Sequence, residues 1–309
     1  MELLVALVIG AVLSFGAMNL LLHSKLSYLE GEEMARLQEN GRHALRYLAY
    51  ELTMAGYLAT RVPAAPVPAV ESGTACFDYL MQTENTLEFL DDVTTAGEPA
   101  SGGPGWPADC LLAGRHVAGT DLLLTRRSAS FPTVVGAEQF AAVDSDAIYL
   151  QAASRSAAPR LQRGGAGPEA NGELWEYLPQ VLFLRNYSVS SGDGVPALCR
   201  KRLGRSSNRM APTECLVEGI ENLQLEFGID ENGDQRPDRF EAAPGPARLR
   251  TAVAARIYLL VRSLHPVAGH IDDKSYTLGA RRVEATGDGY YRRLMRTTVL
   301  LRNQGGCGR

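Results

Sequence analysis

Residues 3–22 read LLVALVIGAVLSFGAMNLLL, an uncharged stretch whose clearly polar members are Ser14 and Asn19. A helix of this composition is long enough to cross the hydrocarbon core of a bilayer, which needs about 20 residues. A cleaved secretory signal would begin with positive charge, whereas no Lys or Arg precedes Lys25 in this sequence. The stretch therefore predicts a membrane helix that the protein retains.

The apolar pattern continues beyond the span as a narrow stripe in steps of three and four residues, which is typical of one face of a helix. The stripe consists of Met34, Leu37, Gly41, Leu45, Leu48, Leu52 and Ala55. We predict one helix from about residue 2 to about residue 56, roughly 80 Å long at 1.5 Å per residue. Its first half would lie in lipid and its second half on a water-soluble domain. Gly41 is a predicted weak point, because Gly costs about 1 kcal/mol in a helix interior.

The overall composition is that of a globular protein. Hydrophobic residues make up 45% and charged residues 21% of the 309 positions, which excludes intrinsic disorder. The formal net charge is −4, so the field of the whole chain does not attract DNA or anionic lipid.

After the helix, the sequence favours strands separated by Gly- and Pro-rich loops. In the clearest strand, Leu223, Leu225 and Phe227 alternate with polar residues, the pattern of a half-buried strand. The predicted strands are 121–126, 147–150, 174–178, 181–187, 223–227, 253–261 and 297–302. An amphipathic helix followed by antiparallel strands predicts an α+β fold in which a sheet covers the helix stripe.

Four segments follow from these patterns. They are a transmembrane segment at 1–24, an amphipathic continuation of the helix at 25–58, a Pro-rich linker at 59–75 and a β-rich soluble domain at 76–309. The linker must lie outside helix, because prolines recur in it. The soluble part is large for a single sheet, so we expect a second sheet or subdomain between residues 76 and 200.

Several short segments carry a resemblance to a known family. ELLVA at residues 2–6 precedes the uncharged span, QENGR and MAGY occupy 38–42 and 54–57, and CLVEGIENLQ and TVLLRN occupy 215–224 and 298–303. The first segment is similar to that of all type IV pilins and pseudopilins. The later ones, with the Asp-rich loop after residue 224, resemble the type IV pilus minor pilins of the PilW family. The resemblance implies a pilin-like fold, with a long helix packed on an antiparallel sheet.

The resemblance also implies a role for Glu2, an acid at the edge of the apolar span. Its carboxylate would neutralise the N-terminal amine of a neighbouring subunit, a pairing that gains strength away from water. On charge alone, an interfacial Glu favoured by the helix dipole is the alternative. Family precursors carry a basic leader that prepilin peptidase removes before a Phe, which is then N-methylated. Leader and Phe are both missing here, so we expect the peptidase as a partner, and methylation, if the true N-terminus lies upstream.

The function implied by the resemblance is that of a non-enzymatic minor pilin. Such a subunit helps to prime assembly of the type IV pilus and enters the fibre, with roles in twitching motility, adhesion and, in some systems, DNA uptake. The implied partners are other minor pilins, the major pilin and the inner-membrane assembly platform. The implied location is the inner membrane of a Gram-negative bacterium, with the soluble domain in the periplasm, and then the pilus at the cell surface.

Other functions remain open at this stage. J-type pseudopilins of type II secretion share the same plan, although QENGR and LVEGI at 216–220 favour PilW. A membrane-anchored, calcium-dependent adhesin or binding domain would never assemble and would tolerate replacement of Glu2. A secreted hydrolase has little support, because the sequence contains no G-x-S-x-G, P-loop or H-E-x-x-H motif. We predict no catalytic residues and no required cofactor.

The five cysteines are Cys76, Cys110, Cys199, Cys215 and Cys307, without a C-x-x-C pair. A soluble part outside the inner membrane would lie in an oxidising compartment, which favours disulfides. The simplest pairs are Cys199 with Cys215 and Cys76 with Cys110. Cys307 is left over, and free, swapped and intermolecular states all stay open for it.

The Asp-rich segment DENGDQRPDRFE at 230–241 is the best candidate for an ion site. Oxygen donors fall at the first, third, fifth, ninth and twelfth positions, with a backbone carbonyl at the seventh, as in loops that wrap Ca²⁺. The predicted ligands of a structural calcium ion are Asp230, Asn232, Asp234, the carbonyl of Arg236, Asp238 and Glu241. Gln235 stands where such loops need Gly, so an Asx-rich hairpin turn without metal is the alternative.

Five cations lie close together after Cys199, namely Arg200, Lys201, Arg202, Arg205 and Arg209. A basic patch could bind a polyanion, but the run lacks the aromatic residues that stack on single strands. We favour a solvated loop or a subunit contact, and DNA is not an expected partner.

Overall fold

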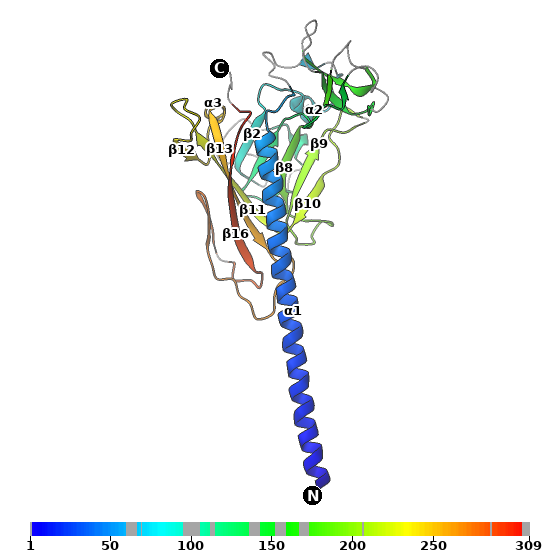
Figure 1. Ribbon diagram of the computed structural model, residues 1–309, viewed down its shortest axis with the longest axis vertical. Coiled ribbons are helices and arrows are strands. Elements are labelled where there is room, and N and C mark those ends of the chain that lie inside the picture. Colours follow the sequence, from blue (N-terminus) through cyan, green and yellow to red (C-terminus); the bar gives the residue numbers. More distant parts are fainter. Residues whose placement is uncertain are drawn as a thin grey trace.

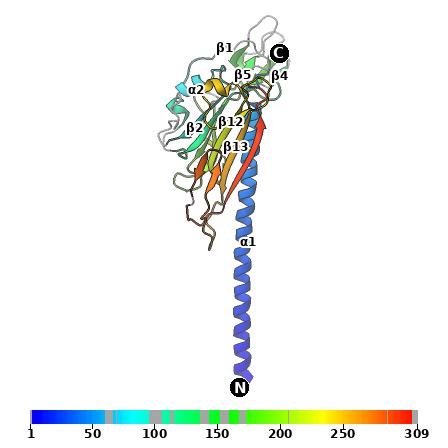
Figure 2. The same cartoon turned by 90° about the vertical axis from the view of Figure 1, so that its left-hand side faces the viewer.

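The computed structural model describes residues 2–59, 67–68, 70–94, 106–111, 115–135, 143–151, 159–166, 173–205, 207–284 and 286–304. Its longest element is α1 (Glu2–Met54), whose first half protrudes from a β-rich head (Figures 1 and 2). The predicted single helix is therefore present and ends two residues before the expected position. The predicted α+β class is confirmed, with a long apolar helix and mainly antiparallel sheets.

One antiparallel sheet lies against the second half of α1, with the strand order β12-β11-β13-β16. Its strands are β11 (Ile220–Ile229), β12 (Arg239–Glu241), β13 (Ala252–Arg262) and β16 (Arg292–Leu300). β16 runs beside α1 along the head (Figure 1). The last strand of the chain thus packs against its first helix. A hairpin of β14 (Tyr276–Leu278) and β15 (Arg281–Val283) lies next to β13.

A second sheet has the order β10-β9-β8-β3-β2 and is also antiparallel. Its strands are β2 (Leu87–Val93), β3 (Thr120–Thr125), β8 (Gln180–Arg185), β9 (Ala197–Arg202) and β10 (Glu214–Glu218). The chain passes from this sheet to the first at Gly219, where φ is +76° and an added Cβ would lie 2.7 Å from the carbonyl oxygen of Arg262. Only Gly combines this conformation with so close an approach.

A third sheet, with the order β1-β6-β5-β7-β4, lies at the end of the head farthest from the N-terminus (Figure 1). Its strands are β1 (Val67–Pro68), β4 (Val134–Val135), β5 (Ile148–Gln151), β6 (Arg160–Arg163) and β7 (Glu173–Glu176). Short helices complete the head, namely α2 (Ala75–Leu80), η1 (Ala108–Cys110), η3 (Gly164–Ala166) and α3 (Pro246–Leu249). The second and third sheets are the additional β structure that the length of the soluble part led us to expect.

The predicted Pro-rich linker at 59–75 falls partly outside the described residues. Within them, Val67 and Pro68 form β1, which pairs parallel with β6, and α2 begins at Ala75. A proline is tolerated in β1 because this strand lies at the edge of its sheet, where one side needs no hydrogen bond.

The main core lies between α1 and the first two sheets. The predicted stripe is confirmed, since Leu37, Leu48, Leu52 and Ala55 are all at most 1% exposed. They pack in one cluster with β11 and β13 residues such as Leu225 and Leu259 and with β8 and β9 residues. Each fully buried Leu contributes about 1.5–3 kcal/mol, so this face of α1 holds helix and head together.

The strand predicted at 223–227 is longer than expected and is covered on both faces. Leu223, Leu225 and Phe227 face the core as predicted, but Gln224 is also buried. Its amide donates to the carbonyl of Gly119 at 3.0 Å and to Asp92 at 3.2 Å. The prediction of a half-buried strand was wrong because β2 and the turn before β3, which are distant in sequence, cover Gln224.

Sequence patterns missed three strands of the second sheet, namely β2, β9 and β10. β2 contains Glu88, Asp91 and Asp92, and β9 contains three consecutive cations. These charges hide the alternation that marks a strand. The two strands exist because long-range pairing with β3 and β8 satisfies their backbone groups.

Gly41 is a close-contact site and not a weak point of the helix. α1 is continuous through Gly41, and Gly41 is buried against the first sheet. An added Cβ would overlap Met295 Sδ on β16 and lie 3.0 Å from Val261 Cγ2 on β13. The missing side chain lets the helix backbone approach the sheet.

We expect Gly41→Leu to destabilise the packing of α1 on the sheet by about 1–3 kcal/mol, the usual cost of overpacking. Gly31→Leu is the matched control, because Gly31 lies in the same helix with open space around it. Urea unfolding of the detergent-solubilised protein, followed by circular dichroism, measures both. Equal midpoints for the two variants would contradict the close contact.

Candidate functional site

The first half of α1 makes no packing contact with the head. Its large apolar side chains, from Leu3 to Leu29, are 46–79% exposed. The most apolar window has a mean hydropathy of 2.3 and is not buried at all, so by length and composition this helix can cross a membrane. An apolar surface this large needs lipid or other helices to cover it. Glu2 lies in the first turn, at one end of the apolar span.

Two acidic side chains mark the point at which α1 enters the head. Glu33 accepts the backbone N–H of Leu264 at 3.0 Å, and its other oxygen lies 2.9 Å from Nδ1 of His265. Burial alone would raise the pKa of Glu33, but the hydrogen bonds from His265 and Leu264 outweigh it and lower the pKa below 4.5. One turn earlier, Tyr291 donates its hydroxyl to Glu30 at 2.5 Å.

A buried ion pair holds the other end of the helix. Arg127, just after β3, donates to Glu51 from Nε at 2.7 Å and from Nη2 at 2.8 Å. The side chains are 10% and 2% exposed. Burial disfavours the charged guanidinium, yet the hydrogen bonds to Glu51 raise the pKa of Arg127. Sequence reasoning missed this pair, although a charged residue immediately before Leu52 of the stripe was a signal.

Both predicted disulfides are present in the structure. Cys76 of α2 is bonded to Cys110 of η1, and Cys199 is bonded to Cys215. The second pair lies directly across β9 and β10 in the ladder. The second disulfide therefore crosslinks two strands of the second sheet, and the first joins α2 to η1 in a cluster that packs on this sheet. Cys307 lies outside the described residues.

The Asp-rich segment forms a turn that uses its own carboxylates. Asp230 accepts the N–H groups of Gly233 at 2.6 Å and Gln235 at 2.8 Å. Asp238 accepts the N–H of Glu231 at 2.7 Å. Similar bonds join Asn232 to the N–H of Asp234 and Asp234 to that of Arg236. These are the bonds of Asx turns.

The calcium prediction for this segment is not supported. Its oxygens point to the N–H groups of the loop, and Glu241 forms ion pairs with Arg239 at 2.6 Å and Arg248 at 2.8 Å. Within the described residues, no three His, Cys, Asp or Glu side chains converge as a metal site would require. Gln235 adopts a φ of +65°, the left-handed conformation for which calcium loops use Gly. The hairpin-turn alternative agrees with these contacts.

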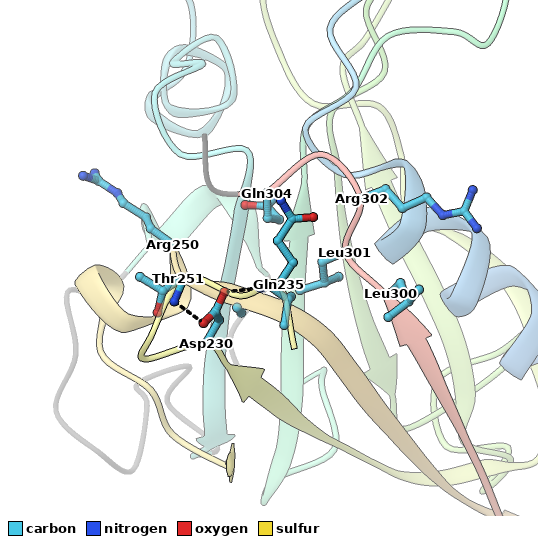
Figure 3. A pocket seen from close by; sticks show the side chains of 11 residues that line it. Asp230, Gln235, Arg250, Thr251, Leu300, Leu301, Arg302 and Gln304 are labelled. Atoms are coloured by element: carbon cyan, nitrogen blue, oxygen red, sulfur yellow. Dashed lines mark hydrogen bonds between the residues drawn. The ribbon is translucent and has the colours of Figure 1, made fainter. Parts of the chain in front are cut away.

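A groove of about 370 Å³ lies beside this turn, between the start of β13 and the end of β16. Figure 3 shows Asp230 and Gln235 of the turn, with Thr251 before β13 and Leu300 at the tip of β16. Leu300 is 56% exposed. The groove is thus lined on one side by polar groups of the turn and on the other by the apolar end of β16.

The basic run after Cys199 is largely neutralised by the head itself. Arg200 and Arg202 pair with Glu214 at 3.0 and 3.2 Å, and Arg205 pairs with Asp144. Lys201 is buried, donates to the carbonyl of Asp109 at 3.1 Å and has its pKa lowered by burial. These contacts favour a structural role over a polyanion site.

One half of α1 is thus apolar and exposed, and the other half is built into a sheet domain. Residues 186–303 match the family model of the Type IV pilus-assembly protein W, PilW. The match contains the sheet on which α1 packs, the second disulfide and Gly219. The resemblance to PilW found in the sequence is confirmed over these residues.

A type IV-like pilin from Thermus thermophilus is a similar solved structure, with 12% sequence identity and a TM-score of 0.39. The alignment covers 87% of this chain and 99% of that chain. No curated protein matches this chain in sequence.

We expect Glu51→Ala to destabilise the protein by about 3–5 kcal/mol, because it leaves the buried Arg127 charge unpaired. Glu32→Ala is the matched control on the same helix, since the Glu32–Arg36 pair is exposed and such pairs contribute about 0–1 kcal/mol. Urea unfolding midpoints measure both variants. A loss no greater than that of the control would show that the pair does not hold the helix.

Calcium should bind weakly or not at all at the Asp-rich turn, because Asp230, Asp234 and Asp238 already accept backbone N–H groups. Isothermal titration of the protein with CaCl₂ should give no heat beyond that of a variant carrying Asp230→Asn. Saturable heat that the substitution abolishes would restore the metal hypothesis.

Proposed function

We propose that this protein is a minor pilin, a non-enzymatic subunit that helps to prime assembly of the type IV pilus and is incorporated into the fibre. The observation that carries the proposal is the division of α1 into an exposed apolar half and a half packed on the head. The match to PilW over residues 186–303 supports it. The expected partners are other minor pilins, the major pilin and the assembly platform in the inner membrane.

The mechanism would be transfer of one helix between two apolar environments. The span at 3–22 is stored in the inner membrane, with the head in the periplasm, and is then extracted into the helical core of the fibre. Both environments remove the same apolar side chains from water. Because α1 is continuous from residue 2 to 54, movement of the span carries the head with it.

Glu2 would set the register of the subunit in the fibre. In a packed helix core, a lone carboxylate is costly unless an opposite charge compensates it. The N-terminal amine of a neighbouring subunit is such a charge. Glu2 would then fix the axial position of the subunit in the fibre, and the apolar surface that follows it would supply the packing free energy.

A type II secretion pseudopilin would use the same helix, and the match to PilW favours the pilus. Deletion of the gene should remove surface pili and twitching motility and leave protein secretion intact. A calcium-dependent adhesin has less support, because carboxylates of the Asp-rich segment accept N–H groups of their own turn.

We expect Glu2→Ala to leave membrane insertion unchanged and to reduce the protein in sheared pili by at least about tenfold, the effect of losing about 1.4 kcal/mol. Glu39→Ala is the matched control, because Glu39 is an exposed acid of the packed half of α1. Immunoblots of membrane and pilus fractions measure both variants. Normal incorporation of the Glu2 variant would refute the assembly role.

A further inference from the structure

The long outer strand β16 has an edge that no other strand of the structure covers. β16 pairs with β13 on one side only, over nine residues. Among the described residues, no other strand pairs with it. An unpaired edge of this length is a template on which another extended chain can add a strand.

The ladder shows which backbone groups point outward. Leu301 donates its N–H to Val253, and Ser263 donates to the carbonyl of Tyr291. The two residues on the β16 side of these bonds, Tyr291 and Leu301, are both odd-numbered. In an antiparallel pair, every second residue of a strand hydrogen-bonds to the neighbouring strand, so the odd-numbered residues of β16 bond to β13. The N–H and C=O groups of Leu294, Arg296, Thr298 and Leu300 therefore face away from β13. Within the described residues they have no backbone partner.

The side chains along this edge are basic. Arg293, Arg296 and Arg302 are exposed and form no ion pair with any described residue, whereas most of the basic run after Cys199 is paired. The groove beside Leu300 extends the edge beyond the end of the strand (Figure 3). Outward backbone groups and exposed positive charge thus occur together along β16, and the groove lies at its end, between β16 and the start of β13.

We propose that the edge of β16 receives an extended, acidic segment of a different pilus subunit as an added strand. The charges argue against a second copy of this chain, because pairing two β16 edges would bring Arg side chains together. Arg293 and Arg296 lie on opposite faces of β16, because side chains of a strand alternate between faces. A partner strand with Glu or Asp on both of its faces would meet both. The inference rests on the proposed function, because it takes its partner from the pilus.

The probe is a synthetic peptide as long as β16, in which pairs of adjacent Glu are separated by pairs of Val and Thr, so that both faces of the added strand carry Glu. The protein is the full chain in detergent. Hydrogen–deuterium exchange at single-residue resolution should show fast exchange at Leu294, Arg296, Thr298 and Leu300 in the free protein. The peptide should slow the exchange of these four amides specifically. A peptide with Lys in place of Glu should leave them unchanged.

Thr298→Pro tests the backbone contribution, because it removes one outward N–H and no bond to β13. Its melting temperature should be close to wild type, and peptide affinity by fluorescence anisotropy should fall at least about tenfold. A triple variant with Arg293→Glu, Arg296→Glu and Arg302→Glu should no longer bind the acidic peptide and should instead bind the Lys peptide. Arg296→Glu is the single charge reversal at the edge, and Arg209→Glu is its charge-matched control, because Arg209 is exposed beyond β9 in the second sheet.

Three outcomes would overturn the inference. They are binding that leaves the four amides unprotected, equal affinity for the acidic and Lys peptides, and protection that arises from self-association without peptide. Peptide binding does not involve the apolar span, so the Glu2→Ala protein should bind the peptide as wild type does. Absence of peptide binding at β16 would therefore contradict the edge proposal alone, and normal pilus incorporation of the Glu2→Ala protein would contradict the pilin function alone.

Discussion

The burial of one face of α1 against two sheets is the contact on which the rest of the structure depends. The stripe around Leu48 and Leu52 joins the helix to strands from distant parts of the chain. Without it, neither sheet would have a cover for its inner face. Gly41 sets how close the helix can lie, since its backbone meets Met295 and Val261 directly.

Polar contacts at the two ends of the packed half then fix the position of the helix. Where α1 enters the head, Glu30 accepts a hydrogen bond from Tyr291 and Glu33 accepts one from the backbone of Leu264. At the far end, Glu51 is paired with Arg127 in a nearly dry environment. The apolar stripe could slide or rotate, because apolar contacts lack direction, whereas hydrogen-bonded carboxylates define one arrangement. The head is therefore held rigidly on a helix whose other half is free.

Much of the candidate site could be predicted from the sequence, because its signals are local. The uncharged span, the stripe and Glu2 lie in one helix, where a spacing of three and four residues defines a face. The cysteine pairs also followed from their order along the chain. The calcium prediction for the Asp-rich segment is not supported, and donor spacing alone does not say where the oxygens point. In the structure, Asp230 turns to the N–H groups of its own loop.

The sequence by itself determined the long apolar helix, its amphipathic continuation and the α+β class, since each depends on composition and periodicity over neighbouring residues. Tertiary structure alone decided which charged segments form strands, that Gln224 is buried, which residue pairs with Glu51 and which edge of β16 is left unpaired. These features arise between residues far apart in the chain, such as Arg127 and Glu51 or Leu301 and Val253. Local preference carries no information on such pairs, because the free energy that forms them comes from contacts that exist only after the chain has folded.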